Sequence, residues 1–241
     1  MAAELEAVLH DGSTIPVTVH GHGPVLLLPV RLQPHPPAEA EIISKWGGEP
    51  DLGPALVNGL SPTNRVITAD YEGHRMAYPD PDTLTPDNLA ADLLAIADAA
   101  GADAFGYYGY SWLALAGLQL SLRTDRLRAL AMGGFPPMDG PYRSMLAVTR
   151  AAHTASTQAP DPASVPVAEA EPGDWDSAAV QTTEAQTRQF VTLYEALQDF
   201  NDSTTADRSR VAAPRLRRRR RPDRLQPAVG RGAGADRRAV G

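Results

Sequence analysis

Four short apolar runs recur along the first part of the chain, at residues 25–30, 65–70, 104–108 and 127–132. Each has the length of a strand and an apolar centre, which is typical of strands covered on both faces. Segments with a helical period separate several of these runs, and such alternation is typical of a parallel sheet with crossover helices. We therefore predict an α/β fold with a mostly parallel sheet flanked by helices.

Local signals define two further elements. One helix is expected to begin after Thr85, a residue type that caps helices, and to end at Gly101, which can adopt the left-handed conformation of a helix stop. Its apolar residues recur at helical spacing, at Leu89, Leu93, Ile96 and Ala100. Before the first buried strand, a hairpin is predicted with strands at 5–9 and 15–19 around a turn dipeptide.

The charge of the chain changes sign near its end. The 241 residues carry a formal net charge of -7, but residues 208–241 hold twelve arginines against two aspartates. That segment therefore has a charge of +10, while residues 1–207 have a charge of -17. Such a reversal separates segments with different roles. The chain has no cysteine, which excludes disulfides, zinc ribbons and cysteine nucleophiles.

These observations divide the chain into three parts. Residues 1–140 form the predicted α/β core, and residues 141–207 form a helical cap or lid in which the strand pattern stops. Within the cap, 159–173 is rich in proline and is predicted to be a loop, and a helix is expected from Ser177. Residues 208–241 form an irregular arginine-rich tail that we expect not to pack as part of the core.

The candidate nucleophile is Ser111, within Gly109-Tyr110-Ser111-Trp112-Leu113, where a predicted strand ends and a buried helix begins. A serine on such a sharp turn projects its hydroxyl from the carboxyl edge of the sheet. The N-terminus of the helix then faces the negative charge that develops on the substrate oxygen. Ser111 as an ordinary helix cap is the alternative interpretation.

This arrangement resembles the α/β-hydrolase family over residues 1–140. Asp70-Tyr71-Glu72-Gly73-His74 resembles an acidic Gly-His loop of that family, and 127–142 resembles the next strand and the entry to the cap. The family usually has glycine where this chain has Leu113. The resemblance implies an esterase-like serine hydrolase with Ser111 as nucleophile, in a nucleophile elbow. It also implies oxyanion donors at the backbone of Trp112 and of Val30 or Arg31.

The resemblance also implies an acid and a histidine base after the serine. Asp223 occupies the expected position of the acid, although five adjacent arginines at 217–221 stand where a buried strand would be needed. Asp139 is the second candidate acid. All six histidines lie at or before His153, so the expected C-terminal base is missing. His153 is interpreted as a surface residue and His74 as a brace for the loop after Asp70.

Location and partners follow from composition. No apolar stretch reaches the ~18 residues of a membrane span, and Glu4 and Glu6 stand where a signal peptide would be positive, so we expect a cytoplasmic protein. The expected partner is a small-molecule substrate, with no metal, cofactor or membrane. Nucleic-acid binding is not favoured, because residues 208–241 contain no aromatic side chain to stack on bases. The oligomeric state is left open.

Two classes of function stay open at this point. The first is hydrolysis of a small ester or acyl compound through Ser111, weakened or abolished by the missing histidine. The second is a non-catalytic hydrolase-like domain, or an anion-binding or nucleic-acid-binding protein that uses its basic tail. The chain has a single lysine beside its many arginines, so the tail is either genuine or the product of a shifted reading frame.

Overall fold

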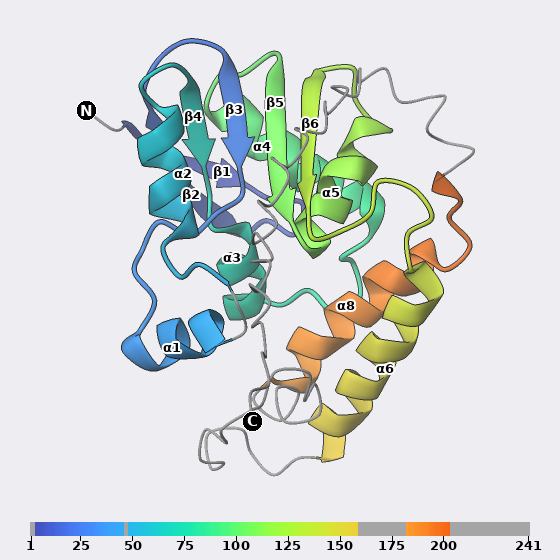
Figure 1. Cartoon of the computed structure of the whole chain (residues 1–241). Helices are drawn as coiled ribbons and strands as arrows, with labels where there is room; N and C mark the ends of the chain where they lie inside the picture. Colours follow the sequence, from blue (N-terminus) through green and yellow to red (C-terminus); the bar gives the residue numbers. More distant parts are fainter. Residues whose placement is uncertain (1–2, 46–47, 159–181, 203–241) are drawn as a thin grey trace, which may run out of the picture.

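The computed structural model describes residues 3–45, 48–158 and 182–202 (Figure 1). Its centre is one six-stranded sheet with the strand order β1-β2-β4-β3-β5-β6. The strands are β1 (Ala3–Val8), β2 (Thr14–His20), β3 (Val25–Leu28), β4 (Arg65–Thr68), β5 (Phe105–Tyr110) and β6 (Leu127–Gly133). All four predicted apolar runs and both strands of the predicted hairpin are therefore strands of this sheet.

The sheet is mixed, with its parallel part in the middle. Strand β3 runs parallel to β4 and β5, and β5 runs parallel to β6. Strands β1 and β2 form the antiparallel hairpin, and β2 joins the sheet antiparallel to β4. Consecutive parallel strands need long crossovers, which the helices supply. The prediction of a mostly parallel sheet flanked by helices is confirmed.

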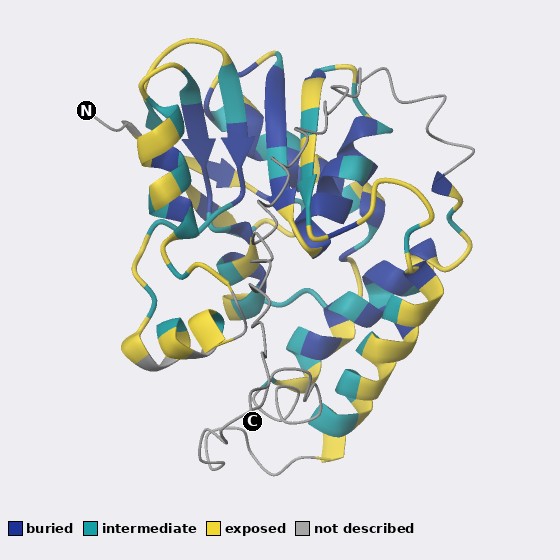
Figure 2. Ribbon diagram, viewed as in Figure 1, coloured by how far each residue is buried: buried dark blue, intermediate teal, exposed yellow. Residues whose placement is uncertain are grey.

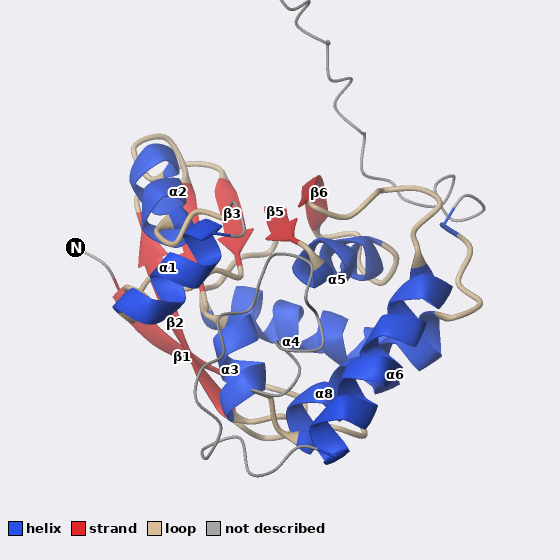
Figure 3. Cartoon of the chain, turned by 60° about the horizontal axis from the view of Figure 1, so that its bottom comes forward, coloured by secondary structure: helices blue, strands red, loops and turns tan. Residues whose placement is uncertain are grey.

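Seven helices are described. They are α1 (Pro37–Lys45), α2 (Leu52–Leu60), α3 (Tyr71–Ala77), α4 (Pro86–Ala99), α5 (Trp112–Ser121), α6 (Tyr142–Gln158) and α8 (Glu184–Leu197). Figure 3 shows α2 on one side of the sheet and α4 and α5 on the other. As the sequence predicts, α4 is capped by Thr85, whose hydroxyl accepts from the Asn88 N–H, and Gly101 has a positive φ of 63°.

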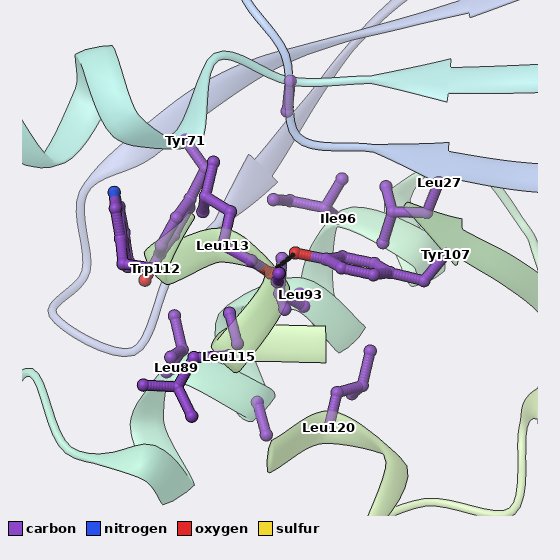
Figure 4. Close-up of a cluster of buried hydrophobic side chains, with 14 of the residues drawn as sticks. Leu27, Tyr71, Leu89, Leu93, Ile96, Tyr107, Trp112, Leu113, Leu115 and Leu120 are labelled. Carbon is purple, nitrogen blue, oxygen red and sulfur yellow. Dashed lines mark hydrogen bonds between the residues drawn. The ribbon is translucent and has the colours of Figure 1, made fainter. Parts of the chain in front are cut away.

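Adjacent residues of the central strands point into two separate cores. Leu27, Ile67 and Tyr107 belong to the large core with α4 and α5 (Figure 4). Their neighbours Leu28 and Val66 belong to a smaller core under α2. Side chains alternate between the two faces of a strand, so both faces must be apolar. This explains why these runs show no polar alternation and why β3, β4 and β5 are largely dark in Figure 2. The expectation that the run at 127–132 is covered on both faces is wrong, because Arg128, Ala129 and Ala131 of the edge strand β6 are exposed.

Helices α6 and α8 form a hairpin that docks beside α3 (Figure 1). The Gln186 side chain donates to the carbonyl of Met76 at 2.7 Å, and the buried Gln189 side chain donates to the carbonyl of Arg75 at 3.1 Å. The helix expected from Ser177 is not continuous into α8, and Ser177 itself lies outside the described residues. Residues 182 and 183 are not helical, and α8 begins after Thr183 because Thr183 and Gln186 form a reciprocal capping box.

Parts of the predicted organisation lie outside the described residues. They are the loop over 159–173 and the arginine-rich tail over 208–241. Within the described ranges, the helices are all too short or too polar to cross a membrane. The cytoplasmic location stays a prediction.

A buried arginine joins the hairpin turn to α3. Arg75 has no exposed surface, and its guanidinium lies 2.9 Å from the Asp11 carboxylate and donates to the Ser13 hydroxyl at 3.0 Å. The Ser13 hydroxyl donates to Asp11 at 2.6 Å. Burial alone would raise the pKa of Asp11, but the Ser13 hydrogen bonds and the Arg75 charge outweigh it and hold that pKa well below its usual range.

The Asp11→Asn substitution tests this ion pair. At pH 7 we expect the free energy of unfolding to fall by about 1–3 kcal/mol, toward the lower end because Asp11 is exposed. An aspartate with a depressed folded pKa stabilises the fold above its unfolded pKa of about 4, and that contribution is lost as the pH falls below this value. The difference between wild type and variant in chemical denaturation should therefore shrink from pH 7 to about pH 3. The exposed Asp103→Asn is the control, and an equal Asp11→Asn effect at both pH values would contradict the ion pair.

Candidate active site

Ser111 follows β5 and precedes α5, and it is exposed. Its backbone has φ 56° and ψ -128°, a conformation that non-glycine residues rarely adopt. Its N–H donates to the carbonyl of Gly133 at 2.8 Å, which ties the turn to the end of the neighbouring strand β6. The strained backbone therefore presents the serine at the carboxyl edge of the parallel strands, as the sequence predicts.

The turn closes only because residue 109 is glycine. A Cβ at Gly109 would lie 2.2 Å from the carbonyl oxygen of Leu113 and 2.8 Å from the backbone nitrogen of Ala114. Leu113, which replaces the glycine expected from the family, points into the large core and is 6% exposed. Its carbonyl accepts the hydroxyl of Tyr107 at 2.8 Å (Figure 4). A leucine at that position is thus compatible with the turn.

Ser111 does not act as an ordinary helix cap. Its side chain makes no capping hydrogen bond, whereas Thr85 and Thr183 both cap their helices from extended backbone conformations. In the described part of the chain, the Ser111 hydroxyl has no hydrogen-bond partner, which leaves it available to react with a bound molecule. The capping interpretation of Ser111 therefore loses its support.

The two expected oxyanion donors differ in whether their backbone N–H already has an acceptor. Trp112 is the first residue of α5, so helix geometry leaves its backbone N–H without an intrahelical acceptor. The Val30 N–H donates to the carbonyl of Leu28 at 2.9 Å and is engaged in this structure. Arg31, the other alternative after β3, stays a prediction. Only the Trp112 donor lies directly beside Ser111 in the chain.

The Trp112 side chain is held between the core and α8. Its indole N–H donates to the Glu72 carboxylate at 2.9 Å, and its ring packs against Tyr71 and edge-on against Phe190 of α8. The protein atoms around the Glu72 carboxyl displace water from it, which raises its pKa. The negative charge of Asp70 raises this pKa further, while the hydrogen bond from the indole lowers it. Glu72 as a residue keeps an exposed surface, so water weakens these effects.

All six histidines are described, and none of them makes a hydrogen bond with Ser111. His74 meets the Ser13 hydroxyl at 2.8 Å, so it braces the hairpin turn and not the loop after Asp70. Burial and the Arg75 charge lower the pKa of His74. His153 is half-buried in the cap and meets Thr187 of α8 at 3.1 Å, which corrects its interpretation as a surface residue.

The contacts of His35, His20 and His22 also do not involve Ser111. His35 contacts Glu39 at 3.3 Å. His20 pairs with Val66 in the sheet, and His22 lies two residues after His20, just beyond the end of β2. Strand β2 runs antiparallel to β4, so this pair of histidines lies at the amino edge of the parallel strands, opposite the Ser111 edge. No histidine therefore makes a hydrogen bond with the Ser111 hydroxyl in the described part of the chain, although the charge of His35 acts on Glu72, the carboxylate that accepts the Trp112 indole N–H.

A largely buried cluster of one histidine and two carboxylates was not found from the sequence. His10 meets the fully buried Asp92 at 2.9 Å through Nδ1 and meets Asp80 at 2.9 Å through Nε2. Asp92 also accepts the backbone N–H of His10 and the hydroxyl of Tyr71. Both ring nitrogens face carboxylates, so this pair anchors the hairpin to α4 and does not serve a nucleophile. Residues 10 and 92 are 82 positions apart, and no local pattern marks them as partners.

Asp139, the candidate acid that the structure describes, makes no hydrogen bond with Ser111. Asp139 is exposed in a turn with φ 54°, and its backbone N–H is held at 2.8 Å by the carboxylate of the buried Asp202. Asp202 also accepts from the Gly140 N–H and the Tyr142 hydroxyl, so it fixes the entry to the cap. Asp223 lies outside the described residues, and its role as acid stays a prediction. Among the described side chains, no group of three or more His, Asp or Glu could hold a metal ion.

The fold is similar to that of several proteins of known structure. Over 88% of its length the chain is similar to 78% of an epoxide hydrolase from Vigna radiata, with 16% identity and a TM-score of 0.50. Over 86% of its length it is similar to 78% of AqDC, a protein described as recognising and cleaving the ring of the Pseudomonas quinolone signal, with 15% identity and a TM-score of 0.50. No family model and no curated protein matches the sequence. The chain therefore has the α/β-hydrolase fold that its sequence resembles.

Two glycine-to-alanine substitutions, one in the tight turn and one in an open position, test the described geometry of the turn. Gly109→Ala should destabilise the protein by about 1–3 kcal/mol, because the new methyl group meets backbone atoms that cannot move independently. A Cβ at the exposed Gly59, in α2, would meet nothing within 4 Å. Gly59→Ala should therefore be neutral or stabilise by up to about 1 kcal/mol. Thermal denaturation measures both changes, and equal effects of the two variants would contradict the described turn.

Proposed function

We propose that this chain is a serine-hydrolase-like protein that reacts with small ester or acyl compounds through Ser111, and that it turns them over slowly. The observation that carries the proposal is the backbone of Ser111 at the end of β5, with φ 56° and no capping hydrogen bond. Such strain persists at sites where it serves a function. The α/β-hydrolase fold supports the proposal.

The proposed chemistry is acyl transfer to a serine. The Ser111 oxygen attacks the acyl carbon and loses its proton, the alcohol leaves with a proton, and water then releases the acid from the acyl-enzyme. The oxygen that becomes negative during attack is stabilised by the Trp112 N–H and the N-terminus of α5. Water or an external base accepts the proton of Ser111, because all six histidines are engaged or located elsewhere. Removing a general base costs typically about 10²–10⁴-fold in rate.

The competing proposal is a non-catalytic hydrolase-like domain. It is favoured by the same observation on the histidines, because a serine without a base is a weak nucleophile. Binding of anions or nucleic acid through residues 208–241 is a separate alternative, and it falls on residues outside the described ranges. Reactivity of Ser111 separates catalysis from both alternatives.

Covalent labelling tests the nucleophile directly. Incubation with a fluorophosphonate should add one phosphonyl group to the wild-type chain, with the adduct located on Ser111 by peptide mass spectrometry. Ser111→Ala should remove the adduct, while Ser61→Ala, at the end of α2, should keep it. No adduct on wild type after prolonged incubation would favour the non-catalytic domain.

Chemical rescue tests the missing base. If proton removal limits the reaction, added imidazole should raise the rate of p-nitrophenyl acetate hydrolysis by wild type above the rate of the imidazole reaction alone. That gain should be absent in Ser111→Ala. Substituting His153→Gln or His35→Gln should leave the rate of wild type within about twofold, since neither side chain contacts Ser111. A loss of activity in either variant would identify that histidine as the base.

A further inference from the structure

The Trp112 side chain connects three parts of the molecule at one point. Its backbone follows Ser111, its ring centre lies 6.0 Å from that of Tyr71 in α3, and it lies 5.3 Å from that of Phe190 in α8. Trp112 is 8% exposed. An indole N–H can only donate, and when buried it needs an acceptor. The Glu72 carboxylate supplies that acceptor at 2.9 Å.

We propose that Glu72 is a positioning residue for the Ser111 site, because its carboxylate fixes the indole of Trp112 and thereby the direction of the Trp112 backbone N–H. The inference rests on the proposed function and adds a residue to it. The contact with Tyr71 is tilted at 40° and the contact with Phe190 is edge-on at 78°, and neither has the directionality of a hydrogen bond. The directional hydrogen bond to Glu72 fixes the rotation.

The chain has a structural reason to hold this ring firmly. The oxyanion donor must be aimed within a few tenths of an ångström, and precise sites are supported by neighbours that lock the rotamer of each contributing residue. The Val30 N–H is engaged with Leu28, which leaves the Trp112 N–H and the Arg31 alternative for this task. A ring free to rotate would let the first turn of α5 relax from its aimed position. Loss of the Glu72 contact should therefore lower Ser111 reactivity without removing the serine.

Two groups carry charge next to the Glu72 carboxyl. Asp70 precedes α3 and accepts the Gly73 N–H, and its negative charge raises the pKa of Glu72. His35, before α1, has the opposite effect when it is protonated. The loss of water around the carboxyl and the charge of Asp70 raise the pKa of Glu72 above the usual glutamate range, against the opposing effects of the indole hydrogen bond and of His35. The indole hydrogen bond should weaken as Glu72 gains its proton.

The experiment compares Glu72→Ala, Glu72→Gln and the control Glu6→Gln, an exposed residue of β1. The rate of fluorophosphonate labelling at Ser111 is measured for each full-length protein. We expect a loss of about tenfold for Glu72→Ala, partial rescue in Glu72→Gln because its amide oxygen still accepts, and no change in Glu6→Gln. A structural role alone would predict similar losses for Ala and Gln.

A spectroscopic readout reports on the contact itself. The indole N–H resonance of Trp112, assigned by its absence in Trp112→Phe, should titrate with Glu72 in wild type and lose that titration in Glu72→Gln. A resonance unmoved by Glu72→Gln would overturn the contact even if Glu72→Ala failed to fold. Labelling at Ser111 that is unaffected by Glu72→Ala would overturn the positioning role alone. No labelling of wild type would overturn both this role and the proposed function.

Discussion

The close approach of backbone to backbone at the end of β5 governs the rest of the structure. Gly109 lies against the carbonyl of Leu113 with no room for a Cβ, and Ser111 takes a positive φ so that α5 can turn back over the sheet. The Tyr107 hydroxyl and the Gly133 carbonyl each hold one side of this turn. These contacts bury α5 against β5 and β6 and leave one serine exposed at the carboxyl edge.

A second set of contacts positions α8 against that turn. Helix α8 is attached to α3 through glutamine side chains that donate to backbone carbonyls, and its Phe190 meets Trp112 beside Ser111. Backbone carbonyls are fixed in space by the helix that carries them, so this attachment sets the distance between α8 and α3. The surroundings of Ser111 are thus built by three elements that are far apart in the sequence.

The sequence predicted those features that depend on local periodicity and turn chemistry. The central strands β3, β4 and β5, the Thr85 cap and the turn at Ser111 all have signals within a few residues, and the structure confirms them. The run at 127–132 is a strand but not a doubly covered one, because β6 lies at the edge of the sheet. Pairs such as His10 with Asp92 and Asp139 with Asp202 could not be predicted, because their partners are joined only by the fold and have no sequence spacing in common. The helix expected from Ser177 does not continue into α8, because a capping box at Thr183 determines the start of α8.

The most direct measurement of the central claim is a high-resolution crystal structure of the full chain before any reaction. It should show Ser111 with a positive φ, its hydroxyl exposed beside the Trp112 N–H, and all six histidine rings beyond hydrogen-bonding distance of that hydroxyl. A histidine ring nitrogen within about 3.2 Å of the Ser111 oxygen would contradict the absence of a base. An extended Ser111 backbone with the side chain capping α5 would contradict its role as a nucleophile.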